Sequence, residues 1–257
     1  MHDPGRAATP TANLFAWTGA IVFVLSLSYF LYSYWVVFGR TADGALRAPA
    51  VIWDLALFSA FAAHHSVFAR EPVRRRLART FPHLERSVYV WVASLLFIVV
   101  CWLWQPVAGV VWELDGPARV VAVVVHVGGI VFSVYSASLI DAFELAGVKL
   151  NAQRPTPYAQ LLPTANSQEL PTPKAQGEEF KTSGPYGLVR HPIYLGWFLL
   201  VFAVGTMTMT RFVFAVVSCV YILVAIPFEE RSIRASSGGA YERYMMRVPR
   251  KLIPGFY

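Results

Sequence analysis

The chain alternates long apolar runs with polar connections. Six runs are apolar almost throughout and are close to 18 residues or longer: 13–38, 50–69, 87–104, 118–140, 192–209 and 212–228. Continuous apolar runs of this length are typical of transmembrane helices, whereas the strands of a membrane barrel alternate apolar and polar positions. The pattern therefore predicts an all-α, polytopic membrane protein with about six transmembrane helices.

The C-terminal part of this pattern is unusually tight. Only Thr210 and Arg211 separate the fifth run from the sixth, which predicts a tight helical hairpin. Beyond Pro227 the sequence becomes charged and is interrupted by two glycines, at positions 238 and 239. Because glycine disfavours a helix interior, we expect a break there and a short cytosolic helix after it.

A long polar stretch divides the chain. Residues 151–177 are rich in Pro, Gln, Thr and Ser, a composition typical of loops. The predicted organisation is an N-terminal four-helix membrane region at 1–150, a polar loop at 151–183 and a C-terminal functional region at 184–257.

Composition and charge support a membrane location and give it an orientation. Only 14% of the residues are charged and the mean hydropathy is +0.49, whereas soluble domains are nearer a quarter charged. Of the 22 Lys and Arg residues, all but Arg40, Arg47, Arg119 and Arg211 fall on the side of the two termini. Cytoplasmic loops carry this excess, so we expect a multi-pass protein of the cytoplasmic membrane with both termini cytosolic. The net charge of +7 then points to membrane lipids, and no nucleic-acid motif accompanies it.

The stretch GPYGLVRHPIYLGW, residues 184–197, concentrates polar chemistry at a membrane boundary. His191 precedes a proline and so avoids the α region, while Pro192 suits the first turn of a helix. We therefore expect a helix to begin at Pro192 and to leave free backbone N–H groups for a carboxylate or phosphate. The alternative is an ordinary membrane entry at which Arg190, Tyr186 and Tyr194 reach the interface.

Two adjacent carboxylates end the last apolar run. The hairpin would return Glu229 and Glu230 to the membrane face that carries His191. Carboxylates at such a position are costly without a partner, which could be Arg190 or a bound cation. The alternative is that they begin a solvated helix, where the helix dipole favours acidic residues.

Ionisable residues also occur inside or at the ends of the N-terminal runs: Asp54, His64, His65, His126, Asp141 and Glu144. Ionisable groups within membrane spans are functional candidates. We favour hydrogen-bonded or substrate-lining roles over metal or haem ligation, because neighbouring histidines on a helix point in different directions. No metal site is predicted.

The C-terminal motifs resemble those of a known family. They are Gly-x-Tyr-x-x-x-Arg-His-Pro-x-Tyr-x-Gly, then Glu-Glu, Gly-x-x-Tyr-x-x-Tyr and Arg-Val-Pro, all within residues 180–254. In this order and spacing they resemble the isoprenylcysteine carboxyl methyltransferase family of integral-membrane enzymes. Looser matches upstream, among them the run LIDAFELAGVKL, look similar to the bacterial methanethiol S-methyltransferase branch.

This resemblance implies S-adenosylmethionine as the cofactor, bound from the cytosol. By position, the following residues would contact it: Phe180, Lys181, Tyr186, Arg190, His191, Pro192, Ile193, Tyr194, Glu229 and Glu230. Tyrosine faces and a glutamate suit its cationic groups, and a helix N-terminus suits its carboxylate.

One departure from the family concerns the methyl acceptor. Prenylcysteine enzymes carry an arginine one turn before the cofactor-binding glutamate, and here that position is Ala225. A small, neutral thiol such as methanethiol, entering from the bilayer, needs no such arginine. His65, His126 and Asp141 are the catalytic candidates on the acceptor side, where a histidine could take the thiol proton. The alternatives are a prenylcysteine carboxylate or a lipid amine as acceptor, or a non-catalytic NnrU-type or haem-bearing membrane protein.

Overall fold

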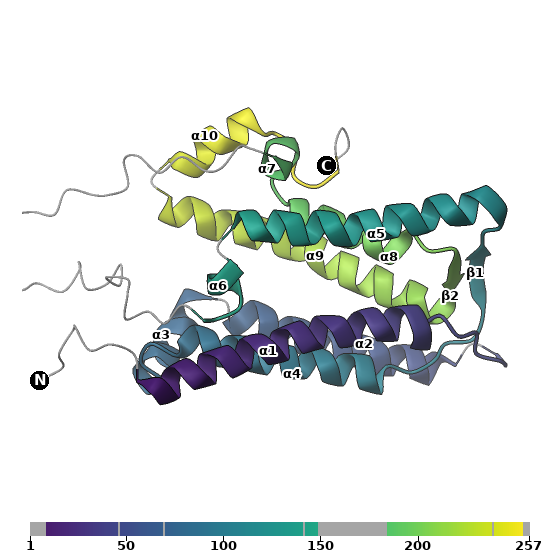
Figure 1. Cartoon of the computed structure of the whole chain (residues 1–257), viewed down its shortest axis with the longest axis horizontal. Coiled ribbons are helices and arrows are strands. Elements are labelled where there is room, and N and C mark those ends of the chain that lie inside the picture. Colours follow the sequence, from purple (N-terminus) through teal and green to yellow (C-terminus); the bar gives the residue numbers. More distant parts are fainter. Residues whose placement is uncertain are drawn as a thin grey trace, which may run out of the picture. The chain divides into compact units, whose positions relative to one another are not determined.

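The structure, a computed structural model, describes residues 9–45, 47–68, 70–140, 142–148, 184–237 and 239–253. The predicted polar loop at 151–183 lies outside these ranges. The helices are α1 (Pro10–Tyr32, continued by a π-helix at Ser33–Val37), α2 (Ala48–Phe68), α3 (Glu71–Thr80), α4 (Glu85–Leu103), α5 (Gly116–Leu139), α6 (Ala142–Leu145), α7 (Pro185–Leu188), α8 (Pro192–Phe202), α9 (Met209–Ser236) and α10 (Ala240–Arg247). Two short strands, β1 (Val110–Glu113) and β2 (Thr206–Thr208), complete the described part of the chain (Figure 1).

The long helices confirm an all-α, multi-pass membrane protein. Five of them are apolar and long enough to cross a membrane: Pro10–Val37, Ala48–Phe68, Glu85–Leu103, Gly116–Leu139 and Met209–Ala235. The fifth predicted run differs, because α8 has only 11 residues. A helix of that length rises roughly 16 Å, about half of a hydrocarbon core of roughly 30 Å. The prediction that residues 192–209 form a full-length span, which would have given six such spans, is therefore wrong.

The connection after α8 also corrects the predicted two-residue hairpin. The chain leaves the helix at Ala203 and forms β2, which pairs antiparallel with β1. Thr210 and Arg211 lie in the first turn of α9, and the side chain of Thr208 caps that helix by accepting from the Arg211 N–H at 3.2 Å. Hydropathy alone missed this strand because Thr206–Thr208 is only three residues long and lies between two apolar helices.

Pro227 does not end the last long helix. α9 continues through it to Ser236, so the charged residues after Pro227 belong to the same helix. The predicted glycine break follows: Gly239 has a left-handed φ of 87° and α10 begins directly after it. The connection between α2 and α4 is rich in arginine and contains the amphipathic helix α3.

The chain folds as two compact units that interleave along the sequence. Unit 1 comprises Met1–Phe30, Phe61–Val99 and Asp141–Lys174, and unit 2 comprises Leu31–Ala60, Val100–Ile140 and Ala175–Tyr257. Unit 1 is held by aromatic packing: Phe15 stacks on Trp91 with ring centroids 5.8 Å apart, and a side chain at Gly19 would meet the Trp91 indole at 2.8 Å.

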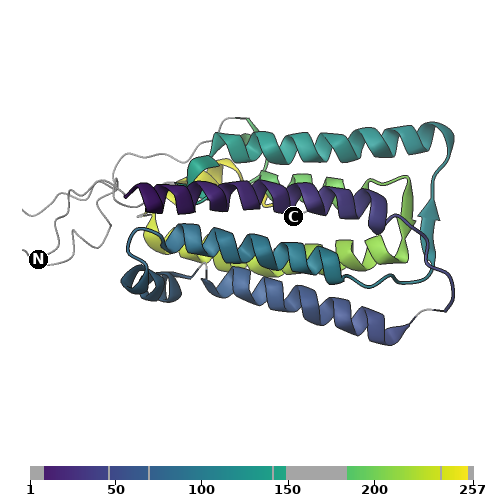
Figure 2. The same cartoon turned by 60° about the horizontal axis from the view of Figure 1, so that its bottom comes forward.

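Unit 2 carries most of the polar C-terminal motifs, and its core is a close pairing of α5 with α8 (Figures 1 and 2). The pairing depends on two glycines, since a Cβ on Gly129 would lie 2.7 Å from the Gly196 carbonyl oxygen. Small residues of this kind let membrane helices approach closely. β1 and β2 lie at one end of unit 2, while α7, α10 and the start of α8 lie at the other (Figure 1).

Candidate active site

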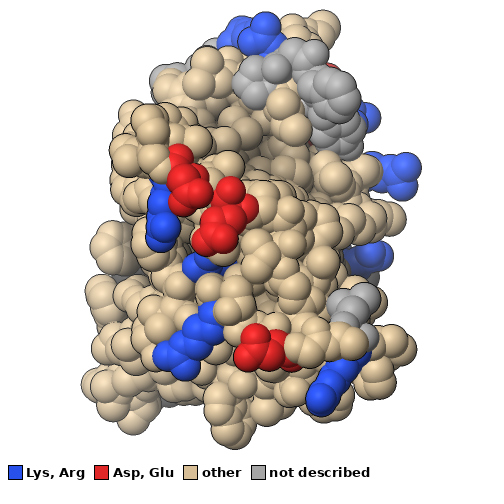
Figure 3. Space-filling model, turned by 90° about the vertical axis from the view of Figure 1, so that its right-hand side faces the viewer, with Lys and Arg blue, Asp and Glu red and all other residues tan. Residues whose placement is uncertain are grey.

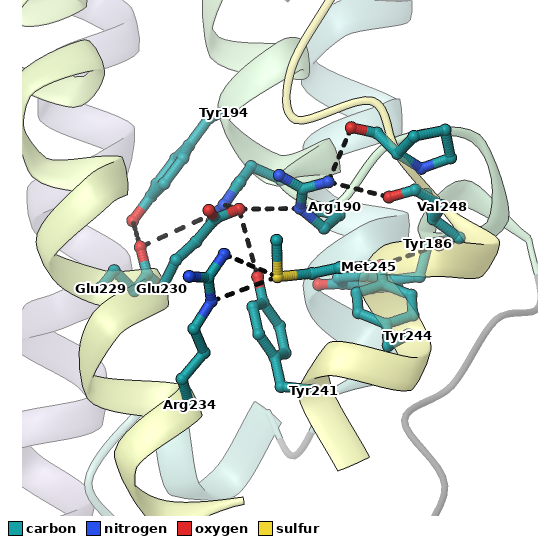
Figure 4. Close-up of polar contacts among 12 residues, drawn as sticks. Tyr186, Arg190, Tyr194, Glu229, Glu230, Arg234, Tyr241, Tyr244, Met245 and Val248 are labelled. Atoms are coloured by element: carbon teal, nitrogen blue, oxygen red, sulfur yellow. Dashed lines mark hydrogen bonds and ion pairs between the residues drawn. The ribbon is translucent and has the colours of Figure 1, made fainter. Parts of the chain in front are cut away.

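The polar C-terminal residues meet where α8 begins, beside the C-terminal part of α9. α8 begins at Pro192, as predicted, with His191 as its N-cap residue in a non-helical conformation. α9 returns from the β2 end and presents Glu229 and Glu230 beside this start (Figure 4). The expected proximity of His191 to the two glutamates is confirmed.

Glu230 and Arg190 form the buried centre of this group. The Arg190 Nε atom lies 2.8 Å from Glu230 Oε1, and the two side chains are 3% and 6% exposed. The same carboxylate oxygen accepts from the Tyr241 hydroxyl at 3.3 Å and lies 3.2 Å from His191 Nε2. A buried carboxylate needs such partners, and Glu230 has a cation, an imidazole and a phenol.

Glu229 has a different environment from its neighbour. Its side chain is 43% exposed, and its Oε2 atom accepts from the Tyr194 hydroxyl at 2.8 Å. His191 Nδ1 lies 4.0 Å from the same oxygen, and the His191 and Tyr194 rings stack with centroids 5.4 Å apart. The site thus presents one accessible carboxylate next to two parallel ring faces, which together suit a cationic group.

Residues of α10 also enter the site, although they were not among the predicted contacts. The Tyr244 hydroxyl donates to the Tyr186 carbonyl at 2.8 Å, and burial raises the pKa of Tyr244 to about 12. Burial likewise raises the pKa values of Tyr241 and Tyr186 above the usual phenol range. The Gly-x-x-Tyr-x-x-Tyr motif could have predicted this contribution, since residues three apart share one face of a helix and the two tyrosines therefore lie on the same side of α10.

The backbone N–H groups of the two residues directly before α8 have partners in the C-terminal segment. The Arg190 N–H donates to the Arg250 carbonyl at 3.0 Å, and the His191 N–H donates to the Lys251 carbonyl at 2.9 Å. The C-terminal segment supplies these acceptors, and the sequence of residues 184–197 alone does not indicate that contact.

Two of the catalytic candidates, His126 and His65, have polar partners of their own. His126 is 1% exposed, and its Nε2 atom accepts from the Trp35 indole at 2.7 Å. That contact places the ring proton on Nδ1 and occupies the lone pair that a base would use. In unit 1, His65 Nδ1 lies 2.9 Å from the Tyr89 hydroxyl.

Three predicted residues, Asp141, Phe180 and Lys181, lie outside the described residues. Within the described ranges, no three His, Cys, Asp or Glu side chains gather as a metal site would require.

An apolar layer adjoins the polar site. Ile222, Ile226 and Leu252 form a buried cluster, and Tyr194 and Trp197 pack against it. Ile222 and Ile226 lie on α9 one to two turns before Glu229, on either side of Ala225, and Leu252 lies in the C-terminal segment. The neighbourhood of the two parallel rings is therefore uncharged on this side.

Three relatives share about a third of their residues with this chain. It is 34% identical to methanethiol S-methyltransferase 2 of Bradyrhizobium diazoefficiens, over 81% of this chain and 74% of that protein. It is 36% identical to methanethiol S-methyltransferase of Crocosphaera subtropica, over 80% and 75% of the two chains. It is 34% identical to methanethiol S-methyltransferase of Mycobacterium tuberculosis, over 83% of this chain and 83% of that protein. No family model and no solved structure matches the chain.

The apolar helices, the arrangement of the Arg-His-Pro and Glu-Glu motifs at one end of unit 2 and these similarities together define an integral-membrane methyltransferase. The resemblance noted in the C-terminal motifs thus extends over most of the chain. The chain belongs to the methanethiol S-methyltransferase family.

Proposed function

We propose that this protein transfers a methyl group from S-adenosylmethionine to a small thiol acceptor of the methanethiol type. The observation that carries the proposal is the exposed Glu229 carboxylate, held by Tyr194 beside the stacked His191 ring and bordered by an apolar layer. The names of the relatives support the same reaction class.

The residues present fit the proposed cofactor. When bound, S-adenosylmethionine supplies a methyl group on a positively charged sulfur, together with an ammonium and a carboxylate. Glu229 offers an accessible negative charge for a cation, and the rings of His191 and Tyr194 offer faces that attract positive charge. Tyr186, Pro192, Ile193, Phe180 and Lys181 complete the contacts that we propose, the last two on the sequence alone. The chain contributes mainly by holding the reacting groups in place and excluding water.

The apolar layer favours a neutral acceptor. With Ala225 in place of an arginine and Ile222 and Ile226 buried nearby, a free carboxylate on the acceptor would find no cationic partner on this part of α9. A thiol must lose its proton as its sulfur takes the methyl group, and the thiolate is the nucleophile. His65 and Asp141 stay our candidates for accepting that proton, on sequence grounds. His126 is better suited to a structural role, because Trp35 already occupies its Nε2 atom.

We place the site on the cytosolic face of the cytoplasmic membrane. The asymmetry of Lys and Arg supports this orientation, since the sparsely charged side carries only four of the 22. A C-terminal tag should then be accessible only after the membrane is permeabilised, and access from outside would contradict the orientation.

Calorimetric titration tests the cofactor proposal. Detergent-purified wild-type protein is expected to bind S-adenosylmethionine, and Glu229→Gln should weaken binding by at least about tenfold, equal to about 1.4 kcal/mol. Glu242→Gln, which neutralises an exposed glutamate in the first turn of α10, is the matched control and should bind normally. Gas chromatography of dimethyl sulfide formed from methanethiol then tests the acceptor. Absence of cofactor binding by folded wild-type protein would sink the proposal.

A further inference from the structure

The C-terminal segment after α10 is bonded along the start of α8. Its backbone carbonyls at Arg250 and Lys251 accept from the N–H groups of Arg190 and His191, at 3.0 and 2.9 Å. Its carbonyls at Val248 and Pro249 accept from Arg190 Nη1, at 2.9 and 2.7 Å. We call residues 248–251 the C-terminal strap.

The strap depends on a single side chain for its attachment at one end. The guanidinium of Arg190 joins three elements: the strap through Nη1, α9 through Glu230, and its own position directly before α8 (Figure 4). Burial of Val248 and Leu252, which are 3% and 0% exposed, seats the segment on either side of these bonds. The strap is thus an ordered part of the site.

The two adjacent glutamates differ in burial and in the number of their polar partners. Glu230 is buried, and its Oε1 atom is occupied by Arg190, His191 and Tyr241. Glu229 is the accessible one, and its neighbours Tyr194 and His191 are attached to α8, whose start the strap holds. A displacement of the strap would therefore shift His191 relative to Glu229.

We propose that Arg190, Glu230 and the C-terminal strap act as positioning elements that hold His191 and Tyr194 against Glu229, and that Arg190 and Glu230 do not themselves contact the cofactor. This inference rests on the proposed function, since it concerns the site that we assign to S-adenosylmethionine. The family resemblance implies that Arg190 and Glu230 contact the cofactor, whereas this inference assigns both residues to positioning its contacts.

The chemistry of Arg190 explains why this position needs arginine. A guanidinium donates through several N–H groups in a fixed plane, and it can serve a carboxylate and two carbonyl oxygens at once. A lysine ammonium would keep the charge opposite Glu230 but is a single point on a flexible stem. Arg190→Lys therefore preserves the ion pair while loosening the strap.

The experiment compares Arg190→Lys with Arg243→Lys, the same exchange at an exposed arginine of α10. Calorimetry with S-adenosylmethionine measures cofactor affinity, and steady-state kinetics with methanethiol measures kcat and both KM values. We expect Arg190→Lys to weaken cofactor binding about tenfold and raise the cofactor KM, with the thiol KM unchanged. Arg243→Lys should match the wild type in all of these quantities.

A second measurement does not depend on a variant that folds. In wild-type protein, hydrogen exchange at the Arg190 and His191 amides reports the strap directly, and saturating S-adenosylmethionine should slow that exchange. Exchange as fast as in an unstructured peptide, with or without the cofactor, would overturn the strap. So would wild-type cofactor affinity in Arg190→Lys.

The measurements distinguish a failure of the proposed function from a failure of the positioning role. Wild-type protein that binds no S-adenosylmethionine would overturn the proposed function and this inference together. Binding by the wild type that Glu229→Gln abolishes and Arg190→Lys leaves unchanged would overturn the positioning role alone.

Discussion

Unit 2 buries one arginine at each end, and their surroundings differ. Arg190 pairs with a carboxylate, whereas Arg211 donates to three backbone carbonyls. Arg211 donates from Nε to Tyr34 and from Nη2 to Trp35, both at 2.9 Å, and from Nη1 to Thr206 at 2.5 Å. It is 8% exposed and its guanidinium carbon lies 5.6 Å from the centre of the Tyr34 ring.

The π-helix at the end of α1 prepares the Arg211 site. The Phe38 N–H bonds to the Ser33 carbonyl at 2.7 Å, a spacing of five residues that widens the last turn. Carbonyls of a last turn have no partner further along the helix and carry its negative dipole end. Arg211 supplies the missing donors and the positive charge, so it caps α1 from the first turn of α9.

The two ends of unit 2 differ in whether a charged side chain is accessible to a ligand. At the Arg190 end, the neighbouring Glu229 carboxylate is 43% exposed and can meet a ligand. On the β1 and β2 side, the visible face is largely uncharged, with a few acidic and basic groups scattered on it (Figure 3). Arg211 bonds backbone carbonyls of another helix, and we propose that Arg190 supports the site assigned to the cofactor.

The largest expected effect is at Arg211. Arg211→Met would leave three buried carbonyls without their donor, and it should lower the free energy of unfolding by about 4 kcal/mol. Thermal denaturation in detergent measures this loss, and Arg119→Met, at an exposed arginine in the first turn of α5, is the control. The folded fraction should still bind S-adenosylmethionine with wild-type affinity. Weakened cofactor binding in the folded fraction would contradict the assignment of Arg211 to structure alone.

A double-mutant cycle at the other end should reveal coupling. Arg190→Met and Glu230→Gln each leave a buried polar partner uncompensated, and each should cost about 3 kcal/mol in unfolding free energy. The double variant should cost clearly less than the sum, because neither partner is then left alone. Additive losses would mean that the pair contributes little as a pair, and the contrast with Arg211 would disappear.

Gly39 offers a smaller and sharper test of the Arg211 cap. A Cβ there would lie 2.3 Å from Arg211 Nη2 and 2.7 Å from the Trp35 carbonyl oxygen. Gly39→Ala should therefore displace the guanidinium and lower stability by about 2 kcal/mol. Gly128→Ala, where a Cβ would meet nothing within 4 Å, is the control and should be neutral or slightly stabilising. Equal melting temperatures for both variants would rule out a tight fit at Gly39.

The smallest expected effect is a pH dependence at the Arg190 end. Burial raises the pKa of Tyr244 from about 10 in the unfolded chain to about 12 in the folded protein. The folded state then holds a proton that the unfolded state releases, so unfolding is favoured as pH rises above 10. Melting temperatures of the wild type should fall more steeply above pH 10 than those of Tyr244→Phe. Parallel curves would show that the Tyr244 phenol titrates normally.

Much of the fold and part of the site could be predicted from hydropathy and local motifs. The first four spans begin and end within about three residues of the predicted runs, because apolar length in a membrane is a property of the local chain. The start of α8 at Pro192 and the break before α10 at Gly239 were also predictable, since proline and glycine act on the backbone at their own positions.

Tertiary structure decided the rest. β2 exists because β1, almost a hundred residues earlier, offers it a partner, and α8 ends early for the same reason. Glu229 and Glu230 are adjacent and chemically identical in the sequence, yet one is exposed and the other is buried against Arg190. The sequence by itself determined the first four spans, the motif order and the charge asymmetry, all of which depend on local composition. Which arginine pairs with a carboxylate and which caps a helix depends on carbonyls and side chains contributed from distant segments, which only the folded chain brings within hydrogen-bonding distance.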